Sequence, residues 1–125
     1  MAYMMIIDDD LDAQQSLALC LKNAGHRVVC ARNGRDALSL ILQQMPDAIL
    51  LDLMMPELDG PSLLEVIRSY LRIQSLPVVV LTGCAETPMI ERVRALSVNA
   101  ILIKGKADTN AILKALEEAI VRVPN

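Results

Sequence analysis

Short apolar runs alternate with longer amphipathic stretches five times along this chain of 125 residues. The runs have the length and composition of buried β-strands. In the stretches between them, apolar residues recur every three or four positions, as on one face of a helix. Strands are predicted over Met4–Asp8, His26–Ala31, Ala48–Asp52, Val78–Thr82 and Ala100–Lys104. Five strand–helix units in succession predict an α/β protein, in which helices cover both faces of a parallel sheet.

Turn and capping residues mark the ends of the predicted helices. Gly25 ends the first helix, Asp59–Gly60 is predicted to be a turn, and Asp108 suits the N-cap of the last helix. The helices are predicted over Gln14–Ala24, from the Asn33–Gly34 turn to about Gln44, from Pro61 to about Arg72, from Thr87–Pro88 to about Leu96, and after Asp108. The side chains predicted to face inward are Leu17, Ala18, Leu21, Ala24, Ala37, Leu38, Ile41, Leu42, Leu64, Val66, Ile67, Leu71, Ile112, Leu113, Leu116 and Ile120.

The polarity of the strands predicts their order in the sheet. The first, third and fourth strands are apolar up to their last residues, as central strands covered on both faces are. The second carries His26 and Arg27, which predicts an edge strand with His26 exposed after the Gly25 stop. No glycine-rich dinucleotide motif or P-loop follows any strand. We therefore predict one domain over residues 1–125, a doubly wound five-stranded sheet in the flavodoxin-like order 2-1-3-4-5.

Charge and composition argue against several classes of protein. The net charge is −3 and no basic cluster occurs, so this chain is not expected to bind nucleic acid directly. The apolar amino terminus lacks a basic start, and no apolar run reaches the roughly 20 residues of a membrane span. Three cysteines at unrelated spacings and one histidine predict neither a disulfide framework nor a zinc site. A reducing cytoplasm is the expected setting.

Polar residues stand at the carboxyl ends of four predicted strands. They are Asp8 and Asp9, Asp52, Thr82, and Lys104. The ends of parallel strands share one edge of an open α/β sheet, so these residues should converge in one crevice. Two carboxylates about 5 Å apart repel by roughly 3 kcal/mol at an effective dielectric constant near 20. Mg²⁺, a hard cation with oxygen ligands, would relieve that repulsion, and an aspartate beside it is a competent nucleophile toward phosphorus.

Four elements together resemble bacterial response-regulator receiver domains, and the resemblance covers essentially the whole chain. They are the acidic segment Ile6–Asp10, the segment Leu50–Gly60 with the sequence LLDLMMPELDG, the strand-terminal Thr82, and the strand-terminal Lys104. An aspartate followed by two apolar residues, Met-Pro and then Asp-Gly is a specific pattern, whereas an acidic pair alone is not. The resemblance implies a two-component phosphoacceptor, in which a phosphohistidine donor transfers its phosphoryl group to Asp52.

The resemblance also implies the residues of the metal site. Asp9 and Asp52 would bind Mg²⁺ directly, together with the backbone carbonyl of Met54, and Asp8 would act through water or assist placement of the ion. The domain would not be an enzyme in the ordinary sense. It would assist its own phosphorylation, and it would also assist its own dephosphorylation, which would be slow.

The resemblance also implies which residues would contact the phosphoryl group and influence its hydrolysis. Thr82 and Lys104 would hold its oxygens, and Gly83 would keep the approach to Asp52 open. Met54 and Cys84 occupy the positions that tune hydrolysis of the acyl phosphate in the family. Since both are apolar, we predict slow intrinsic loss of phosphate.

Three departures from the family pattern lie near the fifth strand. Gly105 follows Lys104 where the family usually has proline, often after a cis bond. A cis bond costs about 3–4 kcal/mol without proline, so a trans bond and a rearranged loop are expected. Ile101 stands where an aromatic ring usually moves during signalling, and Ser97–Val98 replaces the common Gly-Ala. These changes leave the chemistry at the aspartate intact but alter the usual relay.

Three functions compete. The first is a working receiver, phosphorylated by a histidine kinase or histidine phosphotransfer protein and acting on an output domain or partner. The family also leads us to expect a homodimer through the last two helices and the fifth strand. The second is a receiver-fold interaction module whose output does not follow phosphorylation, favoured by Ile101 and Gly105. A remote third is a small Mg²⁺-dependent aspartyl phosphatase similar to haloacid dehalogenases, which carry a second acid where this chain has Met54.

Overall fold

A computed structural model describes residues 1–53, 55, 59–83 and 88–121. Within these residues, five strands form one parallel sheet in the order β2-β1-β3-β4-β5, which confirms the predicted fold. The strands are β1 (Tyr3–Ile7), β2 (Arg27–Ala31), β3 (Ala48–Asp52), β4 (Val78–Thr82) and β5 (Ala100–Ile103). The helices are α1 (Leu11–Asn23), α2 (Gly34–Gln43), α3 (Gly60–Ser69), α4 (Pro88–Arg94) and α5 (Thr109–Val121).

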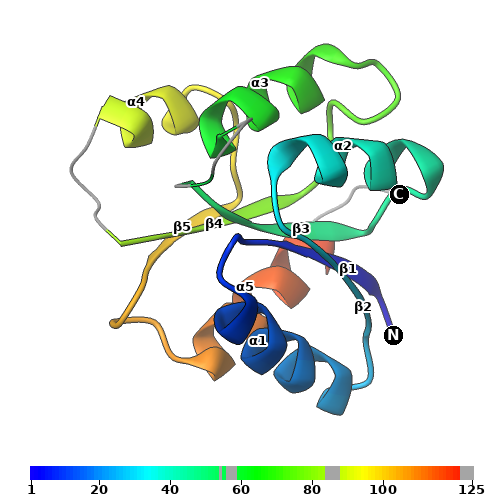
Figure 1. Ribbon diagram of the computed structural model, residues 1–125, viewed down its shortest axis with the longest axis vertical. Coiled ribbons are helices and arrows are strands. Elements are labelled where there is room, and N and C mark those ends of the chain that lie inside the picture. Colours follow the sequence, from blue (N-terminus) through cyan, green and yellow to red (C-terminus); the bar gives the residue numbers. More distant parts are fainter. Residues whose placement is uncertain (54, 56–58, 84–87, 122–125) are drawn as a thin grey trace.

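The sheet lies between two layers of helices, with α2, α3 and α4 on one face and α1 and α5 on the other (Figure 1). Successive side chains of a strand point to opposite faces, so each central strand supplies both cores. In β3, Ile49 and Leu51 belong to the core under α2, α3 and α4, whereas Ala48 and Leu50 belong to the core under α1 and α5. This double coverage explains why the central strands are apolar at successive positions.

Side-chain caps set the start of four helices, including α2, where Asn33 accepts from the N–H of Asp36 at 2.8 Å. Asp10 accepts hydrogen bonds from the backbone N–H groups of Asp12 and Ala13, so α1 begins at Leu11. The predicted start at Gln14 is therefore wrong by one turn. Asp108 accepts from the N–H of Ala111 at 2.8 Å, which confirms the predicted cap of α5. Asp59 accepts from the N–H of Ser62 at 2.8 Å and caps α3. The predicted cap at Thr87 lies outside the described residues.

The carboxyl end of α3 differs from the prediction. The helix ends at Ser69 instead of Arg72, because Tyr70 has an extended backbone conformation. Leu71, predicted to face inward, is 86% exposed. Ile73 and Leu76 from the following loop are buried instead. Ala24, the last predicted inward residue of the first helix, is also exposed, since it follows the end of α1.

The prediction of an exposed His26 is wrong. Its side chain is only 9% exposed, and its Nε2 atom lies 2.8 Å from the Glu117 carboxylate on α5. The backbone N–H of Ala2 donates to the Nδ1 atom of His26 at 3.1 Å. Sequence patterns could not reveal this contact, because the carboxylate lies on the last helix. The histidine thus links the starts of β1 and β2 to α5.

Candidate functional site

Strand pairing brings the predicted site residues to one edge of the sheet. Ile7 pairs with Leu51, Asp52 with Leu81, and Thr82 with Ile103. Each central strand therefore ends close to the same level. The edge consequently carries the five residues predicted from strand polarity, which are Asp8, Asp9, Asp52, Thr82 and Lys104.

Three carboxylates of this edge form a compact acidic cluster. One oxygen each of Asp8, Asp9 and Asp52 lies within 4.8 Å of the other two. Asp8 and Asp52 are only 2% and 5% exposed, whereas Asp9 is exposed to solvent. Buried like charges at this spacing repel unless a cation lies among them. Three carboxylate oxygens suit a hard divalent cation, so these residues could hold a metal ion.

Lys104 places its ammonium group beside the acidic cluster. The Nζ atom lies 3.3 Å from Oδ1 of Asp52 and 3.7 Å from Oδ2 of Asp8. The backbone N–H of Lys104 donates to the carbonyl of Thr82 at 2.8 Å, which ties the end of β5 to that of β4. One ammonium balances only part of the charge of three carboxylates. The site therefore keeps an excess of negative charge for a divalent cation.

Gly60 lies against the backbone that carries Asp52, a constraint that the sequence analysis missed. A Cβ atom at Gly60 would lie 2.6 Å from Cα of Leu53 and 2.8 Å from the carbonyl oxygen of Asp52. The N–H of Gly60 donates to the carbonyl of Leu53 at 3.2 Å. Asp59–Gly60 is thus more than the predicted turn. It starts α3 and brings the helix close to the aspartate.

Other predicted site positions remain predictions. Met54, with its expected carbonyl ligand, and Cys84, one of the expected hydrolysis-tuning positions, lie outside the described residues. Gly83 is exposed, and a Cβ atom built there meets nothing within 4 Å. Packing of the described residues therefore does not require glycine at position 83.

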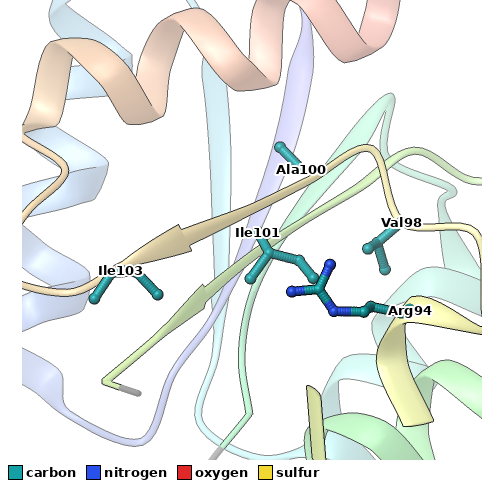
Figure 2. A pocket seen from close by; sticks show the side chains of 5 residues that line it. All are labelled: Arg94, Val98, Ala100, Ile101 and Ile103. Carbon is teal, nitrogen blue, oxygen red and sulfur yellow. The ribbon is translucent and has the colours of Figure 1, made fainter. Parts of the chain in front are cut away.

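A pocket lies on the face where the sequence departs from the family pattern. Its volume is about 530 Å³, and it is lined by Arg94, Val98, Ala100, Ile101 and Ile103. Figure 2 shows the side chain of Arg94 extending from α4 toward Ile101. Ile101 is half-buried and packs at the border of the core under α2, α3 and α4. The isoleucine thus borders an open space beside α4.

The two loops that flank β5 both contain a residue with positive φ. Gly105 has φ +84°, and the peptide bonds of the described residues are all trans, in agreement with the expected trans bond at Lys104–Gly105. Ser97 has φ 60°, a left-handed conformation that disfavours residues with a Cβ atom. This conformation gives a physical reason for the glycine common at that position of the family.

Arg68 holds the loop that contains Ser97. Its Nε atom donates to the carbonyl of Leu96 at 2.7 Å, and its Nη2 atom donates to that of Ser97 at 3.1 Å. Nη1 donates to the carbonyls of Gln74 and Leu76 at 3.1 and 2.9 Å. Burial lowers the pKa of the guanidinium, which remains charged because its ordinary pKa is far above neutrality. Arg68 therefore joins α3 to the loops that precede β4 and β5.

A parallel α/β sheet in this strand order, with an acidic cluster and a lysine at its carboxyl edge, has the architecture of a response-regulator receiver domain. The chain belongs to the response regulator receiver domain family, whose sequence model matches residues 4–117. It is 41% identical over 83 residues to the transcriptional regulatory protein AfsQ1 of Streptomyces coelicolor, a match covering 66% of this chain and 36% of that protein. It is 41% identical over 96 residues to the response regulator MprA of Mycolicibacterium vanbaalenii, covering 77% of this chain and 40% of that protein. The chain thus spans less than half the length of these relatives.

Solved structures agree with this assignment. The chemotaxis protein CheY4 of Vibrio cholerae superposes with a TM-score of 0.87 at 25% identity, over 95% of this chain and 98% of that one. The receiver domain of the Francisella response regulator 1452 gives a TM-score of 0.86 at 27% identity, over 98% of both chains. None of the helices in the described ranges has both the length and the apolar character needed to cross a bilayer.

Proposed function

We propose that this chain is a working phosphoacceptor receiver and that Asp52 is its phosphorylation site. The observation that carries the proposal is the position of the Asp52 carboxylate. It is buried among the acidic cluster, at the end of β3, with the Lys104 ammonium 3.3 Å away. A nucleophilic carboxylate beside a fixed cation is what phosphoryl transfer requires.

The acidic cluster fits Mg²⁺. Asp9 and Asp52 would bind the ion, with the Met54 carbonyl as a further ligand and Asp8 acting indirectly. When bound, Mg²⁺ would neutralise charge on the carboxylates and on the phosphoryl oxygens. A supporting role for Asp8 is consistent with the hydrogen bond that its Oδ1 atom accepts from the N–H of Asp10 at 2.9 Å.

The transfer itself uses one carboxylate oxygen of Asp52. That oxygen forms a bond to phosphorus while the P–N bond of a phosphohistidine donor breaks, and the electron pair stays on the departing imidazole, which takes up a proton from solvent. The Lys104 ammonium and the Thr82 hydroxyl would bind the phosphoryl oxygens, with Gly83 leaving room for the donor. Lys104 would then exchange its contact with the carboxylate for one with the phosphoryl group.

The proposed donor is a histidine kinase or histidine phosphotransfer protein, in the cytoplasm. The relatives are longer than this chain, and one of them, AfsQ1, is named as a transcriptional regulatory protein, so an output domain or a separate partner would receive the signal. We place that contact, or a homodimer, on the surface of α4, β5 and α5, which includes the pocket of Figure 2.

The direct test is phosphorylation by acetyl phosphate in the presence of Mg²⁺. The wild type should incorporate acid-stable but base-labile and hydroxylamine-labile phosphate, as an acyl phosphate does, and Asp52→Asn should incorporate none. Asp12→Asn, which changes an exposed aspartate of α1, is the matched control and should behave as the wild type. Equal labelling of Asp52→Asn would refute the assignment. The phosphorylated wild type also tests the predicted slow hydrolysis, since the loss of its phosphate can be followed over time. A half-life of seconds for the acyl phosphate would contradict that prediction.

A second candidate is a receiver-fold interaction module whose output does not follow phosphorylation. It is favoured by Ile101, which has no ring to move, and by the open pocket beside it. Phosphorylation of Asp52 that leaves the amide resonances of Val98 and Ile101 unchanged would select this candidate. Changes that reach those resonances would select the working receiver.

A further inference from the structure

Gln14 is a buried polar side chain next to the acidic cluster. It is 5% exposed and lies on the same inward face of α1 as Leu17, Ala18 and Leu21. Polar side chains are buried at a cost that hydrogen bonds must offset. The hydrogen bonds of Gln14 must therefore offset the cost of burying its amide.

Both donor hydrogens of the Gln14 amide have an acceptor. The Nε2 atom donates to the backbone carbonyl of Asp8 at 2.7 Å and to that of Ala31 at 2.6 Å. A primary amide has two N–H donors, so these two short bonds use its full donor capacity. The side chain thereby ties α1 to the loop after β1 and to the end of β2.

The two carbonyls are placed where they control the acidic loop. The carbonyl of Asp8 belongs to the peptide group that links Asp8 to Asp9, the two acids beyond β1. Ala31 forms the last pair of the β1–β2 ladder with Ile7, and its carbonyl also accepts from the N–H of Asp8 at 3.1 Å. The pairing of β1 with β2 ends at that pair, and the hydrogen bonds of Gln14 fix the backbone of the loop that follows.

We infer that Gln14 is a positioning residue for the cation site, an inference that rests on the proposed binding of Mg²⁺. Its amide fixes the peptide group between Asp8 and Asp9, and with it the directions in which the two carboxylates leave the backbone. Without that anchor, mutual repulsion would let the peptide group rotate and the carboxylates separate. Groups that orient metal ligands from outside the coordination shell affect affinity by about 10–100-fold.

The test compares Gln14→Met with Gln15→Met. Methionine keeps the length of the side chain and removes the donors, and Gln15 is the exposed neighbour on the same helix. Mg²⁺ is titrated into each folded protein and the dissociation constant is measured by calorimetry or amide NMR. We expect about tenfold weaker binding for Gln14→Met and wild-type affinity for Gln15→Met. Equal affinities in all three proteins would overturn the inference while leaving the proposed metal site intact. A wild type that binds no Mg²⁺ would overturn both.

A second measurement needs no variant, so it tests the positioning role of Gln14 even if Gln14→Met does not fold. Coupling between two sites is reciprocal, so Mg²⁺ must strengthen the hydrogen bonds that favour its binding. In the wild type, the side-chain amide protons of Gln14 should exchange with solvent more slowly in saturating Mg²⁺ than without it, whereas those of Gln15 should not change. Exchange at Gln14 that is unaffected by Mg²⁺ would show a purely structural role and overturn the inference.

Discussion

The carboxyl edge of the sheet and the surface of α4 and β5 meet at Lys104, yet they keep to the family pattern to different degrees. At the edge, the Asp52 carboxylate and the Lys104 ammonium are 3.3 Å apart, and the other acids are in reach of one metal ion. On the surface, Ile101 borders a pocket of about 530 Å³, and Ser97 has a left-handed conformation without being glycine.

The difference has a physical basis. Residues at the edge are placed by strand register, which the hydrophobic pattern fixes strongly. Residues of the surface depend on side-chain volume and on loop conformation, and these can change without moving the strands. The geometry of the edge can therefore be kept while the surface of α4 and β5 diverges. Substitutions confined to one region at a time test this difference.

The largest effect is expected at the edge, from Gly60→Ala. The added Cβ would lie 2.6 Å from a backbone atom, so α3 or the backbone after Asp52 must shift. We expect the free energy of unfolding to fall by about 3 kcal/mol, as measured by urea denaturation. Gly83→Ala, whose Cβ meets nothing within 4 Å, is the matched control and should stay within about 0.5 kcal/mol of the wild type. Equal stability of the two variants would contradict the close approach of α3.

The next effect is expected beside the surface, from Arg68→Met. Four backbone carbonyls would lose a charged donor. We expect a loss of about 2 kcal/mol in urea denaturation, since bonds to charged groups are worth more than neutral ones. Arg72→Met, at an exposed arginine of the following loop, should cost less than about 0.5 kcal/mol. A cost for Arg68→Met no greater than for Arg72→Met would show that the loops do not depend on this side chain.

A gain in stability is expected from Ser97→Gly. The left-handed conformation at φ 60° costs a residue with a Cβ atom roughly 1–2 kcal/mol, and glycine avoids this strain. Part of the gain is lost, because glycine has more conformational freedom in the unfolded chain. The net gain should be about 0.5 kcal/mol, visible as a higher urea midpoint with an unchanged slope. Destabilisation would mean that the serine side chain makes a contribution that outweighs the strain.

The smallest effect concerns the cap of α3 and depends on pH. Burial alone would raise the pKa of Asp59, but hydrogen bonds from Ser62 and the charge of Arg92 outweigh it and lower the pKa. A carboxyl with a lowered pKa in the folded state stabilises the fold above the unfolded pKa of about 3.9, and the contribution is lost as the pH falls through the folded pKa.

Asp59→Asn keeps a capping side chain but removes that charge. The wild type should be more stable than Asp59→Asn by about 0.3 kcal/mol at neutral pH. The difference should shrink as the pH falls below about 4 and vanish near pH 2. Urea midpoints measured across that range provide the check, and a difference independent of pH would contradict the lowered pKa.

The sequence predicted the sheet order and brought Asp8, Asp52 and Lys104 together, because strand polarity and parallel topology determine both. It also contained an unused signal for Gln14, which stands three, four and seven positions before Leu17, Ala18 and Leu21 and so had to face inward.

Other features could not be predicted from local patterns. The His26–Glu117 pair joins β2 to α5, and the close approach of Gly60 to Asp52 depends on how α3 enters the fold. The end of α3 was misjudged because Leu71 continues the apolar period, although Ile73 and Leu76 fill the core in its place. Such features arise from tertiary packing, which overrides local preference.

The most direct test of the central claim is amide NMR of the wild type and Asp52→Asn during titration with beryllofluoride and Mg²⁺. Beryllofluoride mimics a phosphoryl group on an aspartate. In the wild type we predict shifts at the acidic loop, Thr82 and Lys104, and in Asp52→Asn we predict no response to beryllofluoride. The absence of any response in the wild type, or the same response in both proteins, would contradict Asp52 as the phosphoacceptor.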